Sequence, residues 1–384
     1  MSKKYLTYSY RVYPNKKQRE LIFLTFESCR EVYNIVFKDT LKVYNKFKKY
    51  INYCVLKGKE SNEEKFFKRN KIRKISQVRH LHADYMKVDS LALVSEKNNV
   101  INGFKRFFEG SNAFPKYKRR NDKNTYVTSN VNNNIRIENG KIRIPKVGMV
   151  KAKLHRELPL KSKIKKAVVK EDKCGKFYIG LVVEFEDIKE DNNNFEDIIG
   201  LDFKVGEIFV DNNGYTPNYA KPYRMALTRL KKIQEMTQGK TRFSNQYNRI
   251  INKIRRLHKY IANLRADILH KVSNWLTTIY NNIVVETLSI IDIAKKLKSG
   301  INTYDTSYNK FINMIKYKIE GKLIFVDKWF PSSKLCSNCG NRKKKLKLDQ
   351  RVYKCHVCGM EMDRDRNAAK NIKKEGLKLL KLRN

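Results

Sequence analysis

Two pairs of cysteines in the last quarter of the chain have the spacing of metal ligands. Cys336 and Cys339 form one C-x-x-C pair, Cys355 and Cys358 form the other, and fifteen residues separate the pairs. A glycine follows each pair and permits the tight turn that brings two thiolates to one ion. Four thiolates complete a tetrahedral shell, so the sequence predicts one structural Zn²⁺ with no open position for chemistry. An iron–sulfur or redox site is the alternative, which the paired spacing disfavours.

Four acidic residues stand where strands are expected to end or a helix to begin. Asp202 and Glu286 each follow a short apolar run, and Asp363 and Asp365 lie at the start of the last expected helix. Buried carboxylates need partners or metals, and three at one sheet edge would repel one another unless divalent cations lay between them. Two Mg²⁺ ions held in this way clamp both oxygens of a phosphodiester displacement. Spacing alone therefore indicates a candidate metal nuclease, although each acid singly also fits a strand-end or helix-cap role.

The charge of the chain indicates what it binds. Its 384 residues include 84 Lys and Arg against 38 Asp and Glu, a formal net charge of +46. Such a charge repels itself in a compact protein acting alone, so it favours a polyanionic partner. A duplex carries one charge per ~1.7 Å, so this excess could match at most about 80 Å of double helix. The expected partner is a long nucleic acid, and 41% hydrophobic residues still suffice for folded cores.

Membrane and secreted classes fit the sequence poorly. The apolar runs are far shorter than the ~20 residues of a spanning helix, and no apolar signal core follows the first lysines. Seven cysteines, four of them in close pairs, do not suit a disulfide framework. We therefore expect a reduced, intracellular protein with no membrane partner. A basic protein of the membrane surface is the alternative.

The order of elements predicts a multidomain α+β protein whose first domain covers residues 1–187. The first residues alternate in the manner of a strand, and two alternating stretches surround Asn139-Gly140 as in a hairpin. We expect the strands of about 1–14 and 125–187 to form a small β-barrel. A helical recognition region, at about 15–124, is expected as an insertion between them.

The second half is expected to form a separate α/β domain. Seven acidic residues and one lysine lie between Glu184 and Asp197, counted inclusively, which indicates a solvated acidic linker at 188–197. Short apolar strands and helices then alternate from 198 to 384. The cysteine quartet lies within this domain, as an insert at about 330–360.

The chemistry-bearing residues lie within longer motifs, which are Tyr10-Arg-Val-Tyr-Pro14, Phe114-Pro-Lys-Tyr-Lys118, Gly200-Leu-Asp-Phe203, Val284-Val-Glu-Thr-Leu288, Phe330-Pro-Ser-Ser-Lys-Leu-Cys336, Arg351-Val-Tyr-Lys-Cys355 and Asp363-Arg-Asp-Arg-Asn-Ala-Ala-Lys-Asn-Ile372. Together these motifs resemble the TnpB family of transposon-associated proteins, which are related to the type V CRISPR effectors. The likeness covers nearly the whole chain and is densest from 198 to 372. One departure is Thr287, where relatives often carry Asp, but it removes no metal ligand.

The resemblance implies an RNA-guided DNA endonuclease with a RuvC-like nuclease domain of the RNase H type. It places the catalytic, Mg²⁺-binding carboxylates on Asp202, Glu286 and Asp365, with Asp363 as the alternative to the last. The zinc ribbon is inserted between the last two catalytic elements, which matches the order in this chain. Candidate DNA-reading segments are 88–99 and 125–131.

The implied partners are a guide and scaffold RNA transcribed near the transposon end and a double-stranded target DNA. Two Mg²⁺ ions would support cutting beside a short recognised motif, in the cytoplasm of a prokaryote and at its nucleoid when bound to DNA. Two alternatives remain. One is a non-cutting RNA-guided or plain DNA-binding regulator of transposition, and the other is a CRISPR-array-guided type V effector. The oligomeric state does not follow from the sequence.

Overall fold

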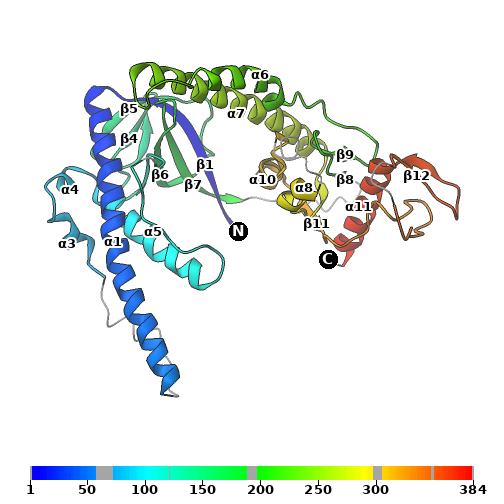
Figure 1. The fold of residues 1–384 in the computed structure, drawn as a ribbon, viewed down its shortest axis with the longest axis horizontal. Coiled ribbons are helices and arrows are strands. Elements are labelled where there is room, and N and C mark those ends of the chain that lie inside the picture. Colours follow the sequence, from blue (N-terminus) through cyan, green and yellow to red (C-terminus); the bar gives the residue numbers. More distant parts are fainter. Residues whose placement is uncertain are drawn as a thin grey trace. The chain divides into compact units, whose positions relative to one another are not determined.

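The computed structural model describes residues 2–57, 72–120, 122–187, 197–296, 305–346 and 350–382. The chain divides into two compact units, residues 1–188 and residues 189–384. Figure 1 labels their elements, and each unit is described by itself below. The acidic linker expected at 188–197 lies outside the described residues except for Asp197, and stays a prediction.

The first unit is built on an antiparallel sheet of seven strands, which are β1 (Ser2–Tyr13), β2 (Thr125–Ser129), β3 (Arg136–Glu138), β4 (Lys141–Ile144), β5 (Gly148–Lys153), β6 (Lys163–Glu171) and β7 (Phe177–Asp187). Their order across the sheet is β2-β6-β7-β1-β5-β4-β3. The central strand β1 buries Tyr10 and Val12 and exposes Arg11 and Tyr13. This alternation is the period-two pattern of a strand with one face on a core.

The sheet of the first unit is open. Its edges are β2 and β3, and no pairing joins these two strands within the described residues. The sheet is a half-barrel, so the closed barrel predicted from the sequence is not confirmed. The predicted hairpin is confirmed between β3 and β4, where Asn139 and Gly140 have φ values of 47° and 71°. Both residues tolerate the positive φ that this two-residue turn requires.

The described helices of the first unit follow β1 and precede β2 in the sequence, and they are α1 (Lys16–Leu56), α3 (Ile75–Arg79), α4 (Asp84–Lys87) and α5 (Ser90–Phe108). A reciprocal cap starts α1, because the Gln18 N–H donates to Asn15 Oδ1 at 2.9 Å and the Asn15 N–H donates to Gln18 Oε1 at 3.1 Å. Asp89 caps α5 by accepting from the Leu91 N–H at 3.1 Å. The insertion of helices between two strands of one sheet is thus present in the chain order.

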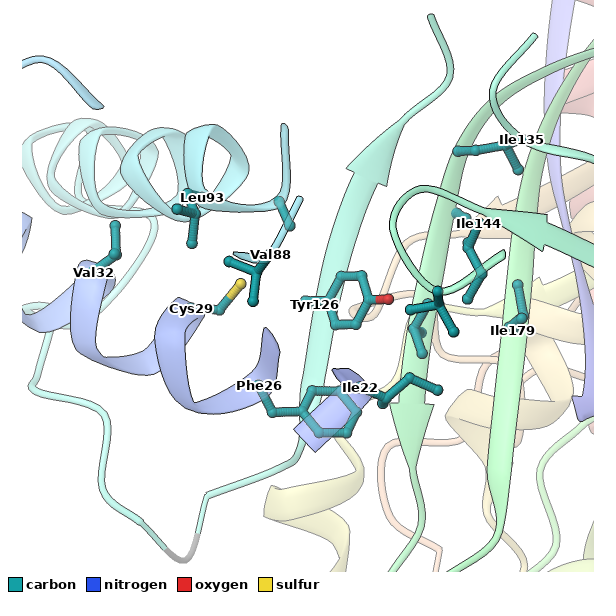
Figure 2. Close-up of a cluster of buried hydrophobic side chains, with 14 of the residues drawn as sticks. Ile22, Phe26, Cys29, Val32, Val88, Leu93, Tyr126, Ile135, Ile144 and Ile179 are labelled. Atoms are coloured by element: carbon teal, nitrogen blue, oxygen red, sulfur yellow. The ribbon is translucent and has the colours of Figure 1, made fainter. Parts of the chain in front are cut away.

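One apolar core joins these helices to the sheet. Figure 2 shows side chains of α1 and α5 converging on the ring of Tyr126 in β2. Cys29 is buried in this core, as a small apolar residue would be. The labelled members from α1 and α5 are Ile22, Phe26, Cys29, Val32 and Leu93.

The second unit contains a four-stranded sheet, made of β8 (Ile198–Asp202), β9 (Val210–Asp211), β10 (Asn282–Glu286) and β11 (Lys322–Val326) in the order β11-β10-β8-β9. Strands β8, β10 and β11 are parallel, and β9 is antiparallel to β8. Ile199 and Ile283 face one apolar cluster, while Ile198 and Val284 face another. Burial on both faces explains why these strands are continuous apolar runs in the sequence.

The described helices of the second unit are α6 (Pro222–Glu235), α7 (Asn245–Ile279), α8 (Ile290–Lys296), α10 (Tyr308–Lys318) and α11 (Arg364–Lys381). Helices α6 and α7 pack together through Leu230, Leu257 and Ile261. A short antiparallel ribbon, β12 (Val352–Lys354) and β13 (Glu361–Asp363), precedes α11. The cysteine quartet therefore lies between β11 and α11, at the position in the chain that the sequence predicted.

Candidate active site and metal centre

Two parallel strands bring Asp202 and Glu286 to the same edge of the second sheet. In the register of β8 and β10, Leu201 lies opposite Val285. Asp202 and Glu286 are the next residues of the two strands, and each is the last residue of its strand. Because the carboxyl ends of parallel strands open at one edge, both carboxylates stand there together.

Helix α11 covers the face of the sheet toward which Asp202 points. A Cβ atom on Gly200 would lie 2.3 Å from the carbonyl oxygen of Ala369, so the helix backbone rests directly on β8. Asp202 follows Gly200 by two residues and therefore shares its face. Asp365 precedes Ala369 by four residues and lies on the same side of the helix. The packing thus carries Asp365 toward Asp202.

Glu286 faces the same helix. Gly376 of α11 lies against Val284, because a Cβ atom on Gly376 would be 2.4 Å from Val284 Cγ2. Glu286 follows Val284 by two residues and shares that face. The two strand-end acids that the resemblance implied thus lie on the sheet face covered by α11, the helix that carries the third, Asp365.

The charges of Glu286 and Asp365 act on Asp202. Burial raises the pKa of Asp202 well above its usual range, and the charge of Glu286 and then that of Asp365 raise it further. Burial also raises the pKa of Glu286, against the lowering effect of a hydrogen bond from Ser332. The pKa of Asp365 is raised by burial and next by Asp363, while Lys204 lowers it. Like charges raise one another's pKa only at short range, so the carboxylates share one site.

The structure separates the roles of Asp363 and Asp365. Asp363 precedes α11, and its Oδ1 accepts the backbone N–H groups of Asp365 and Arg366, each at 2.9 Å. Its side chain is therefore the cap of the helix. Asp365 lies in the first turn and is partly buried, whereas Asp363 is exposed. This geometry favours Asp365 as the third carboxylate of the site.

Two site residues lay outside the sequence prediction. The Ser332 hydroxyl donates a hydrogen bond to Glu286 Oε1, and Tyr308 of α10 packs against Phe203 at a ring distance of 4.7 Å. Burial raises the pKa of Tyr308, and the charges of Glu286 and Asp202 raise it further. The sequence offered a signal only for Ser332, which belongs to the Phe330–Cys336 motif.

The donor set suits a hydrated divalent cation. The buried Tyr308 hydroxyl has no hydrogen-bond partner among the described residues, and hydrated Mg²⁺ keeps several waters that could serve it. Among the described residues, the three carboxylates do not approach one another within the 4.8 Å that contains the four cysteine sulfur atoms. Hard carboxylate oxygens and an unpartnered hydroxyl at one sheet edge are the groups that such a cation would satisfy.

The four predicted cysteines converge. The distance from Cys336 Sγ to Cys358 Sγ is 3.6 Å, that from Cys339 Sγ to Cys355 Sγ is 3.7 Å, and all four sulfur atoms lie within 4.8 Å of one another. A tetrahedral shell with Zn–S bonds of about 2.3 Å requires sulfur atoms about 3.8 Å apart. The observed spacing therefore fits a metal held by four thiolates.

Each cysteine pair sits in the same kind of turn. The Gly340 N–H donates to the Cys336 carbonyl at 2.9 Å, and the Gly359 N–H donates to the Cys355 carbonyl at 3.1 Å. Both glycines have positive φ, 76° and 70°, which residues with a Cβ rarely adopt. The backbone N–H of Met360 is the main cause that lowers the pKa of Cys358 to about 6. The second turn thus favours the thiolate form of Cys358, whereas in the first turn the backbone of Asn341 lowers the pKa of Cys339 but burial and the neighbouring cysteines raise it to about 12.

Helix α11 is tied to the first cysteine turn by two buried asparagines. The Asn367 carboxamide accepts the Ser337 N–H at 2.9 Å and donates to the Leu335 carbonyl at 2.7 Å. Asn371 donates to the carbonyls of Ser332 and Leu335, both at 2.8 Å. The segment from 332 to 337 therefore contacts Glu286 through its serine and the Asp365 helix through its backbone.

Three family models match the chain. Residues 181–297 match the OrfB_IS605 family, described as a probable transposase, and residues 308–372 match the Cas12f1-like TNB domain. Residues 1–50 match a helix-turn-helix domain of OrfB_IS605 proteins. In the structure those residues form β1 and most of the single helix α1.

None of the helices in the described ranges is long and apolar enough to cross a membrane.

The chain is similar to proteins named as RNA-guided DNA endonucleases. A candidate RNA-guided DNA endonuclease of Streptomyces pristinaespiralis is 27% identical over 96% of this chain and 89% of its own length. InsQ of Escherichia coli K12, which carries the same description, is 28% identical over 70% of each chain. A solved structure of Cas12f1, in a complex with sgRNA and target DNA, shares the fold at a TM-score of 0.53 and 12% identity, covering 97% of this chain and 99% of that one. The resemblance to the TnpB family is thus confirmed.

Proposed function

We propose that this chain is a transposon-associated, RNA-guided DNA endonuclease of the TnpB family. The observation that carries the proposal is that Asp202 and Glu286 lie on the sheet face covered by α11, the helix of Asp365, and that the charges of Glu286 and Asp365 raise the pKa of Asp202. A protein that only bound DNA would have no use for three half-buried carboxylates of like charge at one sheet edge. The relatives' names and the shared fold support the same activity.

The site supports hydrolysis of a phosphodiester. Two bound Mg²⁺ ions would supply the activated water and the stabilisation of the leaving 3′ oxygen. Asp202 and Glu286, at the ends of rigid parallel strands, would hold the ions, and Asp365 would complete the ligand set from α11. Ser332 orients the Glu286 carboxylate by donating to it. The strands, not loops, set this geometry, which keeps it rigid.

The domain plan of the proposal follows the sequence. Residues 1–187, with the open half-barrel sheet formed by about 1–14 and 125–187 and the helical region at about 15–124, would read a short motif in duplex DNA. The RuvC-like domain at 198–384, with its zinc ribbon at about 330–360, would cut. One Zn²⁺ on the cysteine quartet would hold the ribbon together.

The proposed partners are a guide and scaffold RNA transcribed near the transposon end and a double-stranded target DNA. In RNA-guided effectors base pairing reads the sequence while the protein reads shape and a short motif. The lysines and arginines that give the chain its +46 charge would mainly contact phosphates. We expect the protein in the cytoplasm of a prokaryote, at the nucleoid when DNA is bound.

Cleavage by the purified complex tests the proposal. The full chain is purified with its co-expressed RNA and given a plasmid that carries the guide-matched target beside a randomised motif. We expect Mg²⁺-dependent cutting that Asp202→Ala and Glu286→Ala each abolish. Asp267→Ala, an exposed acid on α7, is the matched control and should cut normally. Full cutting by Asp202→Ala would refute the nuclease assignment and favour a non-cutting regulator.

A CRISPR-array-guided effector remains the second candidate, because the Cas12f1-like domain matches 308–372. Sequencing the RNA that copurifies with the chain separates the two. A transcript reading out of a transposon end supports the first proposal, and a processed repeat–spacer transcript supports the second.

A further inference from the structure

A tryptophan stands exposed beside the candidate active site. Trp329 is 80% exposed, although an indole is among the most apolar side chains, and it is one of only two tryptophans in the chain. Leaving so much aromatic surface in water forgoes the stabilisation that its burial would bring. The exposed indole contributes little to the stability of the fold, and its surface is available for contact with a ligand.

The turn that carries Trp329 contacts the site at both ends. At one end the Val326 carbonyl accepts the N–H of Thr287, the residue after Glu286, at 3.0 Å. At the other end the Ser332 hydroxyl donates to Glu286 itself. Trp329 is three residues from each end, and three residues of chain span at most about 10 Å. Its backbone is therefore within about 10 Å of the residues that contact Glu286 or its neighbour.

The turn is also rigid. The Trp329 N–H donates to Asp327 Oδ1 at 2.7 Å, and the Phe330 N–H donates to the Asp327 carbonyl at 3.0 Å. Phe330 anchors the turn in the apolar cluster between the sheet and α11. The backbone that carries the indole is therefore held in place before any ligand arrives, which lowers the entropy cost of binding.

The chemistry around the indole suits a nucleotide. A π face stacks on any nucleobase, and alanine substitution of such an aromatic contact typically removes a stacking contribution for each base. Lys328 Nζ lies 4.8 Å from the Trp329 ring centroid and offers a positive charge for the adjoining phosphate. A base within a duplex already stacks on both faces, so the ligand must be unpaired.

We propose that Trp329 is a stacking platform for an unpaired base of the DNA strand being cut, with Lys328 beside its phosphate. The platform would fix the strand next to the carboxylates and would select single-stranded over duplex substrate at the site. This inference rests on the proposed nuclease function, but its binding test needs no cutting.

Tryptophan fluorescence tests the binding directly. The full, zinc-loaded chain carries Asp202→Asn to prevent cutting and Trp275→Phe to leave Trp329 as the single emitter; Trp275 is on α7, packed against Tyr215. The probes are oligo(dT), an abasic oligomer with the same number of phosphates, and a duplex of the same length. We expect saturable quenching by oligo(dT) and little by the other two. Equal quenching by the abasic oligomer, or none by oligo(dT), would overturn the proposal.

Cleavage kinetics give a second readout. Trp329→Ala should lower kcat/KM by about 5- to 100-fold, the range that loss of one base stack predicts. Trp329→Phe should restore most of this loss, and Trp275→Phe should cut as the wild type does. Unchanged cutting by Trp329→Ala would count against the platform. A wild-type chain that shows the quenching but never cuts would refute the nuclease proposal alone.

Discussion

At the start of α11, Asp363 caps the helix and Asp365 is the candidate third carboxylate of the site. Substitution of each residue tests these separate roles. Asp363→Ala removes the cap on two backbone N–H groups and should lower the free energy of unfolding by about 0.5–2 kcal/mol, with cutting retained. Asp365→Ala should abolish cutting and leave the cap intact. Calorimetry and plasmid cleavage measure both. The reverse pattern would move the third carboxylate to Asp363.

The pKa of Asp202 predicts how stability depends on pH. Because its pKa is raised in the folded chain, the folded state holds the proton more tightly than the unfolded state does, and stability without Mg²⁺ should fall as pH rises above the ordinary value of 3.8. Asp202→Asn removes the ionised form, so it should unfold at a higher temperature than the wild type at pH 8, with a smaller gain at pH 5. Thermal unfolding in Mg²⁺-free buffer is the measurement. An equal gain at both pH values would contradict the raised pKa.

Mg²⁺ should reverse this pH dependence in the wild type. Protons and the cation compete for the same carboxylates, so the Mg²⁺ concentration for half-maximal cutting should rise as pH falls. Asp267→Asn on α7 is the control: it should gain no unfolding temperature, and its Mg²⁺ requirement should change with pH as that of the wild type does.

We expect the Tyr308 hydroxyl to affect both the stability of the chain and the Mg²⁺ concentration that cutting requires. A buried hydroxyl without a partner costs about 1–3 kcal/mol, and none of the described residues pairs with this one. Tyr308→Phe should therefore stabilise the Mg²⁺-free chain by up to that amount, while raising the Mg²⁺ concentration needed for cutting. Thermal unfolding and a Mg²⁺ titration check the two effects. A destabilised Tyr308→Phe chain would mean that the hydroxyl has a partner within the protein.

At the scale of elements, the site depends on how closely α11 rests on β8. A methyl group on Gly200 would meet the Ala369 carbonyl at 2.3 Å, so Gly200→Ala must push the helix away and Asp365 with it. We expect cutting to fall by more than tenfold, since small misplacements of catalytic groups cost about that much or more. Gly103→Ala is the matched control, because its nearest neighbour would lie at 3.4 Å. Normal cutting by Gly200→Ala would show that α11 does not position the site.

The cysteine ribbon is the second element that places α11. Asn367 and Asn371 bind the segment from 332 to 337, which includes the first cysteine turn. The ribbon itself buries few apolar side chains, with Tyr353 as its largest. A small unit of this kind commonly needs a metal to hold its fold, so loss of a metal from the cysteines should also disturb the position of α11.

At the scale of the whole molecule, the two compact units predict two separable responses to metal loss. Cys336→Ser should lower the unfolding temperature of the unit 189–384 and reduce cutting, while the unit 1–188 keeps its own core and its transition. Differential scanning calorimetry with and without Zn²⁺ measures this. Cys174→Ser, outside the quartet, is the control. Unchanged unfolding and cutting after Cys336→Ser would rule out a structural metal.

The sequence by itself indicated which groups of this protein could do chemistry. Cysteine spacing predicted the four-cysteine cluster, because close pairs in a tight turn need little else to converge, and the apolar runs before Asp202 and Glu286 predicted strand ends. Net charge indicated a nucleic acid partner. Local signals of this kind depend on neighbours in the chain, which is why the hairpin at Asn139-Gly140 was also correct.

Only the tertiary structure decided which acids meet and what holds them. The choice of Asp365 over Asp363 depends on a helix cap, and the roles of Tyr308 and Ser332 depend on contacts between distant segments. The first sheet is open, although a closed barrel was expected. Closure depends on whether the edge strands β2 and β3 pair, and no local sequence pattern shows this. Packing, through α11 on Gly200, turns three scattered carboxylates into one site.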